Sequence, residues 1–150
     1  MRYARQAGRK ALERSANCEA ITFFEQALSA AQRLPNNRER EEQEIDLRFD
    51  LRLGLMPLGE FGRTLELLNE AKGLATELND QRRLGWIAAY MTNVFWELGE
   101  QDRAVESGRH ALVIARSLED GALLNKVNRY LGRSHYAIGD YRQAMTFLRR

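Results

Sequence analysis

Apolar residues recur every three or four positions along most of the chain. Two sets of four with this spacing are Leu47, Leu51, Leu55 and Leu58, and Leu65, Leu68, Ala71 and Ala75. This period matches an α-helix that buries one side. No stretch alternates between apolar and polar residues for long enough to predict a strand. The pattern therefore predicts an all-α protein.

A longer pattern recurs at intervals of 44, 40 and 40 residues. A full copy has a small residue, a large apolar residue four positions later, and an Ala three positions after that; the third copy has Gly108 at the large position, and the fourth ends before its last Ala. The copies are Ala20, Phe24 and Ala27; Thr64, Leu68 and Ala71; Ala104, Gly108 and Ala111; and Ala144 with Leu148. Small residues let antiparallel helices cross closely, and large ones fill the space between them. We expect Tyr90, Phe95, Tyr130 and Leu131 to serve as large packing residues of the partner helices.

Two kinds of turn separate the predicted helices. In the first kind, a Gly precedes an acidic residue, at Gly59-Glu60, Gly99-Glu100 and Gly139-Asp140. The Gly is expected to end one helix in the left-handed conformation, and the acidic residue to cap the next helix. The second kind follows Leu34, Leu78 and Leu118.

These signals together predict helices near residues 2–14, 17–34, 38–56, 61–78, 81–98, 101–118, 121–138 and 141–150. Pro57 is expected to end the third helix, because proline lacks a backbone N–H and clashes with the preceding turn. We expect one domain over residues 1–150, with units near 1–37, 38–80, 81–120 and 121–150, the last one truncated.

Several of these residues resemble the tetratricopeptide repeat (TPR) family. They are Tyr130-Leu131-Gly132, Tyr136, Gly139-Asp140-Tyr141 and Ala144, together with Ala20-Ile21, Phe24 and Ala27-Leu28. The resemblance implies a right-handed superhelical α-solenoid of antiparallel helix pairs, about seven or eight helices in all. The long spacing is similar to that in kinesin light chains, polarity scaffolds and bacterial signalling regulators. Departures from the repeat are Gly108, Arg52, Thr92 and His135.

The first segment resembles the start of the repeat region in bacterial adenylate/guanylate cyclases and in ATPase-linked transcriptional regulators. The residues are Ala7-Gly8, Ala11-Leu12, Ser15-Ala16 and Glu19-Ala20. This likeness implies a regulatory fragment of a larger bacterial signalling protein. The sequence also ends within a predicted helix, at Phe147-Leu148-Arg149-Arg150. We therefore expect a boundary inside a longer array, whose uncapped end could form a homodimer.

Composition narrows the class of partner. The chain has 23 basic and 21 acidic residues, a formal charge of +2, which gives no general attraction to nucleic acid or to an anionic membrane. The one cysteine, Cys18, allows no internal disulfide. No run approaches the ~20 apolar residues of a membrane span, and no secretory signal begins the chain. A cytoplasmic location is expected.

Residues with catalytic potential are few. No phosphate-binding loop or dinucleotide fingerprint occurs, and we expect no cofactor, no metal and no enzymatic activity. His110 and His135 stand in different repeats without a partner at ligand spacing, so structural roles are expected for both. Cys18 is expected in the core or on the surface. The acidic segment 39–44 is expected to be a solvated helix face.

The TPR geometry implies a concave groove lined by the first helix of each pair. The groove positions are Phe49, Leu53, Met56, Trp86, Asn93, Trp96, Lys126, Arg129, Arg133 and Tyr136. An apolar, aromatic stretch would thus lie beside a basic one. Arginine binds carboxylates with two parallel hydrogen bonds, and asparagine can hold a peptide backbone. We therefore predict a protein-interaction module for a peptide or domain of acidic character.

Other interpretations of the same residues stay open. The aromatic residues could belong to the core, and the arginines to a solvated surface. A second candidate function is a small-ligand sensor, which would close a pocket around Trp86 and Trp96. RNA binding is disfavoured by the near-neutral charge. The carboxylate clamp of chaperone-binding repeats is not matched, because Tyr130 stands where an arginine would be needed.

Overall fold

The computed structural model describes the backbone of residues 1–137 and 141–149, and the side chains of residues 1–134 and 145–149. Within these residues the backbone is helical throughout, apart from short turns, which confirms the all-α prediction. The elements are α1 (Arg2–Glu13), α2 (Asn17–Gln32), α3 (Arg38–Leu55), the 3-10 helix η1 (Met56–Leu58), α4 (Phe61–Glu77), α5 (Gln81–Glu97), α6 (Gln101–Ser117), α7 (Gly121–Ala137) and α8 (Tyr141–Leu148). Helix α3 ends just before Pro57, as predicted.

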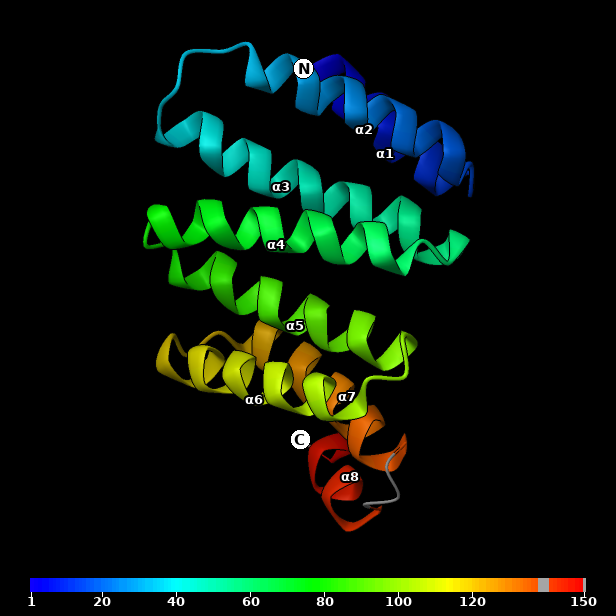
Figure 1. The fold of residues 1–150 in the computed structure, drawn as a ribbon, viewed down its shortest axis with the longest axis vertical. Helices are drawn as coiled ribbons and strands as arrows, with labels where there is room; N and C mark the ends of the chain where they lie inside the picture. The colour runs from blue at the N-terminus through cyan, green and yellow to red at the C-terminus, as the bar shows by residue number, and fades with distance from the viewer. Residues whose placement is uncertain (138–140, 150) are drawn as a thin grey trace. The chain divides into compact units, whose positions relative to one another are not determined.

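The helices fall into two compact units, which are described separately. Unit 1 comprises Met1–Leu78 and unit 2 comprises Asn79–Arg150. In unit 1, consecutive helices run antiparallel and pack in sequence order, α1 on α2, α2 on α3 and α3 on α4 (Figure 1). In unit 2, α6 packs against both α5 and α7, and α7 packs against α8. The prediction of one domain over residues 1–150 stays a prediction.

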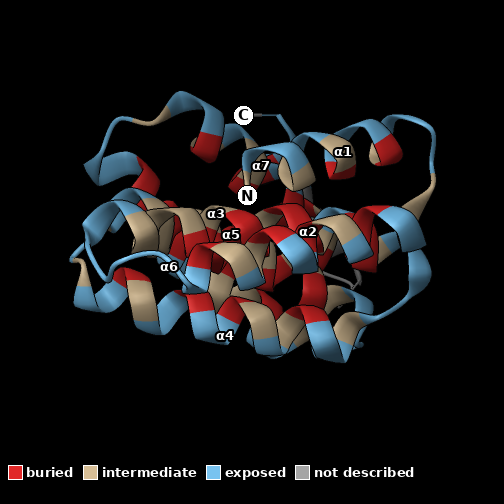
Figure 2. Cartoon of the chain, turned by 90° about the horizontal axis from the view of Figure 1, so that it is seen from above, coloured by how far each residue is buried: buried red, intermediate tan, exposed pale blue. Residues whose placement is uncertain are grey.

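The core of unit 1 forms where small and large residues alternate between α1 and α2. Ala20 and Ala27 are fully buried, and Phe24 between them is also fully buried. Gly8 of α1 faces this ring, since a Cβ at Gly8 would lie 2.5 Å from Cε1 of Phe24. Figure 2 shows buried and exposed segments alternating along α1 and α2. The phenyl ring therefore occupies the volume that the glycine leaves open.

The core of unit 2 also packs large side chains against glycines, but with different residues. A Cβ at Gly108 of α6 would lie 2.4 Å from Cδ2 of Leu131 and 3.3 Å from Cγ2 of Thr92. Both Leu131 and Thr92 are fully buried. The large residue missing from the third repeat copy is thus replaced by a leucine from α7. Gly85 of α5 has the same kind of role, since its missing Cβ makes room for Leu123 and Ile114.

The turns confirm one part of the capping prediction and correct another. Gly59 and Gly99 adopt the left-handed conformation, with φ of 74° and 77°. Glu60 and Glu100 stand at the N-cap positions, but neither side chain accepts a capping hydrogen bond. Glutamate is one methylene longer than the preferred capping residues, and the Glu100 carboxylate accepts from Arg103 Nη1 instead, at 3.0 Å.

The second kind of turn carries the side-chain caps. Asp80 Oδ1 accepts from the backbone N–H of Arg83, and Asp120 Oδ1 accepts from that of Leu123, each at 3.1 Å. Before each aspartate, a non-glycine residue has a positive φ of 53°, namely Asn79 and Glu119. Asparagine tolerates this conformation better than glutamate does. Gly139 and Asp140 lie outside the described residues.

The acidic segment 39–44 is not wholly solvated, contrary to expectation. Glu44 is 7% exposed, and Arg48, one turn later, is equally buried. Arg48 Nη1 donates to the Glu44 carbonyl at 3.0 Å, and Arg48 Nε donates to Glu70 of α4 at 2.9 Å. Arg40 Nε adds an ion pair to Glu44 at 3.4 Å. Burial is tolerated here because each carboxylate lies beside a guanidinium.

In the described part of the chain, no helix combines the length and the apolar character that crossing a membrane requires.

Candidate binding surface on the inner helices

The predicted groove residues lie on α3 with the adjoining η1, on α5 and on α7, and so fall into one group in each unit. Phe49, Leu53 and Met56 belong to unit 1. The group in unit 2 consists of Trp86, Asn93, Trp96, Lys126, Arg129 and Arg133. Tyr136, the last predicted position, lies outside the residues whose side chains are described.

In unit 1, the predicted residues form a stripe along α3 that ends in η1, which we call the α3 stripe. Phe49 and Met56 are half-buried, and Leu53 between them is 44% exposed. Their neighbour Asp50 is buried and accepts a hydrogen bond from Arg5 Nε of α1 at 2.7 Å. The α3 stripe is therefore a short apolar surface beside an ion pair that joins α1 to α3.

In unit 2, Trp86 and Asn93 lie on the side of α5 that points away from α6, and Trp86 also packs against the apolar core of the unit. The opposite side of α5 contacts α6, because Ser107 Oγ donates to the Ala88 carbonyl at 2.8 Å and Arg103 covers the Phe95 ring at 4.5 Å. Trp86 and Asn93 are partly exposed, each about half a helical turn from those positions. Both are therefore on the accessible side of the helix.

Helix α7 contributes the cations. It contains Lys126, Arg129 and Arg133 and has no aspartate or glutamate along its length. Leu131 points toward Gly108 of α6, so the stripe from Lys126 to Arg133 lies on another side of the helix. Arg129 is exposed, and the other two cations are partly exposed.

Contacts between α5 and α7 join the aromatic and basic stripes into one surface. The guanidinium carbon of Arg133 lies 4.1 Å from the centroid of the Trp96 ring. Arg133 Nη2 is also 4.0 Å from Oε1 of Glu97. Stacking on an aromatic face holds the guanidinium in place without using its N–H groups. Helices α5 and α7 therefore hold the guanidinium of Arg133 in a defined position.

Three further residues belong to this surface but were not among the predicted positions. Tyr90 and Tyr130 were expected to pack in the core. Tyr90 is instead partly exposed, with its ring centroid 5.7 Å from that of Trp86. Tyr130 is buried in the core of unit 2, as expected, and its ring lies 5.8 Å from Lys126 Nζ. Glu97 is the third. The helical spacing from Trp86 to Tyr90, Asn93 and Glu97 is a signal that could have identified two of them.

We call this surface the α5/α7 face. Its members are Trp86, Tyr90, Asn93, Trp96 and Glu97 of α5, and Lys126, Arg129, Tyr130 and Arg133 of α7. It combines four aromatic residues with three cations and one carboxylate. The indole nitrogen of Trp96 is buried and has no hydrogen-bond partner among the described residues.

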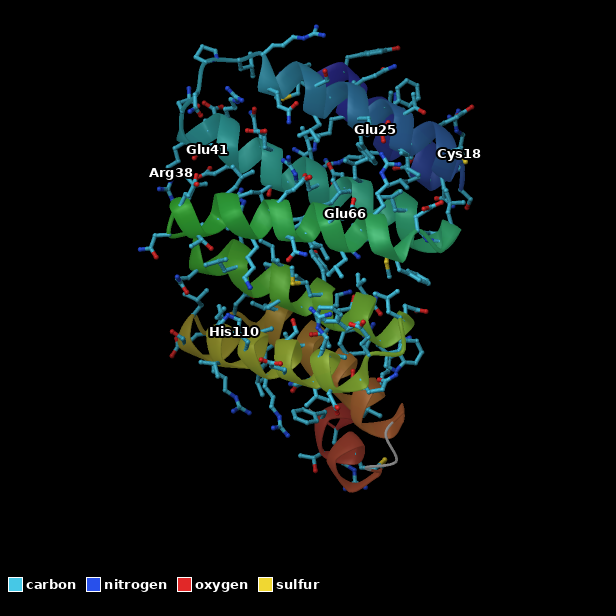
Figure 3. The ribbon with its side chains drawn as sticks, viewed as in Figure 1. Cys18, Glu25, Arg38, Glu41, Glu66 and His110 are labelled. Atoms are coloured by element: carbon cyan, nitrogen blue, oxygen red, sulfur yellow. The ribbon has the colours of Figure 1, made fainter. Side chains whose placement is uncertain are left out.

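Two of the remaining candidate residues, Cys18 and His110, lie on helices of different units. Cys18 lies at the N-terminal end of α2 and His110 lies on α6, and both are exposed (Figure 3). The described residues include no group of three His, Cys, Asp or Glu side chains that could hold a metal ion. The side chain of His135 lies outside the described residues.

Comparisons with known proteins identify structural similarity only. No family model and no curated protein sequence matches the chain. The apo form of RapI has a TM-score of 0.86 at 17% identity, over 99% of this chain and 40% of RapI. The Rap conjugation gene regulator of the plasmid pLS20, solved in complex with the Phr peptide, has a TM-score of 0.86 at 17% identity, over 98% of this chain and 40% of the regulator.

A third similar structure contains TPR-like repeats by description. The nearly identical repeats of a putative kinesin light chain from Podospora anserina have a TM-score of 0.77 at 18% identity, over 99% of this chain and 71% of that one. The fold is therefore that of a TPR-like helical repeat protein, which confirms the resemblance at the level of fold. The chain spans 40% of the length of each Rap protein that it matches.

Proposed function

We propose that this chain is a protein-interaction module without catalytic activity, and that it binds an acidic peptide segment of a partner protein on the α5/α7 face. The observation that carries the proposal is the placement of three partly exposed aromatic rings, Trp86, Tyr90 and Trp96, beside three cations on two adjoining helices. Aromatic residues and arginine dominate the binding energy of many protein interfaces.

The chemistry of the face supports a partner with both carboxylates and apolar side chains. Arg129 and Arg133 can each hold a carboxylate through paired N–H groups. Trp86 and Tyr90 offer an apolar wall, and Asn93 offers both a donor and an acceptor for a peptide backbone. The α3 stripe of Phe49, Leu53 and Met56 is proposed as a separate apolar contact for the same class of partner.

A role in signalling is part of the proposal. It is supported by the fold that the chain shares with a conjugation gene regulator whose structure holds a peptide. We infer that the chain acts as a regulatory segment of a larger signalling protein, with the acidic peptide as its input.

Selection of random displayed peptides on the immobilised chain tests this function. We expect the selected peptides to be enriched in Asp and Glu beside apolar residues. Their affinity should fall by about tenfold or more in the Arg129→Glu/Arg133→Glu variant, because two attractive charges become repulsive. The matched control is Arg109→Glu/Arg116→Glu, which makes the same charge change at exposed positions of α6.

The two variants separate the possible outcomes. Loss of binding in the α7 variant alone supports the proposed face. Equal binding by both variants would place the contact elsewhere and contradict the assignment. If no peptide is selected from a diverse library, the interaction module is wrong, and a small-ligand sensor becomes the better hypothesis.

A further inference from the structure

Glu97 is the one carboxylate in the sequence of α5, and α7 has none. Its Oε1 lies 4.0 Å from Arg133 Nη2, and the two side chains are 33% and 41% exposed. An ion pair this long and this exposed contributes little to stability. Glu97 is also the last residue of α5, where a negative charge opposes the helix dipole. The carboxylate therefore has no evident role in stabilising the helix.

Arg133 has a second contact that explains how its charge is presented. Its guanidinium lies over the face of Trp96 at 4.1 Å. A stacked guanidinium keeps its in-plane N–H groups available at the edge, where they can donate two hydrogen bonds to one carboxylate. Glu97 lies too far away to accept a hydrogen bond of normal length. The best position for a carboxylate beside Arg133 is therefore not filled by Glu97.

We propose that Glu97 is an intramolecular competitor that sets the affinity of the α5/α7 face for acidic peptides. In the free chain, Glu97 partly neutralises Arg133. In the complex, a carboxylate of the peptide takes the paired N–H groups of the same guanidinium, and the Glu97 charge is left as a repulsive neighbour. This inference rests on the proposed function, because it assumes that an acidic peptide is the partner. Glu97 is accordingly a specificity-determining residue that limits binding.

The test uses two labelled peptides and fluorescence anisotropy. The first is Gly-Glu-Trp-Glu-Leu-Glu-Gly, and the second has Gln in place of each Glu. We expect Glu97→Gln to bind the acidic peptide about two- to fivefold more tightly than the unchanged chain, the range expected for an exposed ion pair. The neutral peptide should show no such gain. In an Arg133→Gln background, Glu97→Gln should have a much smaller effect, because the shared guanidinium is gone.

A matched control separates local competition from long-range charge. Asp102→Asn removes one exposed carboxylate from α6 and leaves the α5/α7 face unchanged. Its effect should be small at physiological salt, where charges more than ~8 Å apart are screened.

The outcomes distinguish this inference from the proposed function. Suppose that the acidic peptide binds and that Arg129→Glu/Arg133→Glu weakens its binding, but that Glu97→Gln leaves the affinity unchanged. The role of Glu97 as a competitor is then wrong, while the proposed binding face is retained. An equal gain for both peptides, or an equal gain in Asp102→Asn, also overturns the competitor. Failure of the acidic peptide to bind any variant overturns both the inference and the acidic-partner proposal.

Discussion

The first helix pairs of units 1 and 2 place a small residue and its larger packing partner on different helices. In unit 1 the first helix carries Gly8 and the second carries Phe24, which fills the space over the glycine. In unit 2 the first helix carries Thr92 and the second carries Gly108, and Leu131 of the following helix enters the opening. The repeat thus preserves packed volume rather than residue identity.

Arginine side chains also make different contacts in the two units. In unit 1, Arg5 of α1 is bound to the buried carboxylate of Asp50 at 2.7 Å. In unit 2, Arg133 stacks on Trp96 and has only a long contact to Glu97. Arg5 therefore joins two helices of unit 1, whereas the guanidinium of Arg133 in unit 2 remains accessible to a partner.

The largest expected effect comes from Phe24→Ala, which removes the ring that fills the space over Gly8. A fully buried phenylalanine costs about 3–5 kcal/mol when cut back to alanine, because the cavity only partly collapses. Guanidinium chloride unfolding followed by circular dichroism measures the loss. Val113→Ala is the control, since Val113 is 67% exposed and should change stability by less than about 0.5 kcal/mol. Similar losses in both variants would contradict the packing description.

Gly108→Leu restores the usual large residue in the copy that lacks it, and we expect it to destabilise unit 2. The new side chain would overlap Leu131, and overpacking of this kind costs about 1–3 kcal/mol. Fluorescence of Trp86 and Trp96 reports the unfolding of this unit, since both tryptophans lie in α5.

A double variant makes the same prediction sharper. Adding Leu131→Ala to Gly108→Leu removes the group that the new leucine meets. The double variant should therefore lose less stability than the two single variants lose together. The difference should be at least about 1 kcal/mol, as for residues in direct contact. Additive losses would show that Leu131 does not occupy the space beside Gly108.

Replacing one cation in each unit tests the difference in charge use. Arg5→Gln leaves the Asp50 carboxylate buried without its partner, so it should cost about 1–2 kcal/mol. Arg133→Gln removes a partly exposed stacked cation and should cost less than about 0.5 kcal/mol. Chemical unfolding at one salt concentration compares the two. A larger loss for Arg133→Gln would reverse the assignment of structural and binding cations.

The smallest expected effect concerns the turns. Glu119 has φ of 53°, whereas Gly99 in the preceding turn has φ of 77°. Glu119→Gly should stabilise the chain by a few tenths of a kcal/mol, up to about 1, because glycine adopts positive φ without a steric penalty. Gly99→Ala should destabilise it by about 1 kcal/mol for the converse reason. Thermal unfolding measures both, and shifts of the same sign would contradict the explanation.

Local patterns predicted much of the fold. The apolar period located the helices, and the recurring glycines located turns, because both signals act over a few residues. Capping was predicted less well. Glu60 and Glu100 stand at N-cap positions without capping, while Asp80 and Asp120 cap their helices. The difference lies in side-chain length, which decides whether a carboxylate reaches the backbone N–H groups of the next turn.

Helical spacing also placed six predicted groove residues of unit 2 on α5 and α7, but it did not show which side chains would be covered. Tyr90 was expected in the core and is partly exposed beside Trp86. Glu44 was expected in solvent and is buried beside Arg48. In both cases the outcome depends on residues that pack from other helices, which a local pattern does not contain.

The sequence by itself determined the helical class, the repeat spacing, the glycine turns and the basic character of α7, because these follow from short-range backbone geometry and composition. The tertiary structure decided that Leu131 fills the space at Gly108 and that Arg133 lies over Trp96 beside Glu97. These contacts join residues 23, 37 and 36 positions apart on different helices. Only close packing of whole helices brings such residues together and selects one arrangement of their side chains.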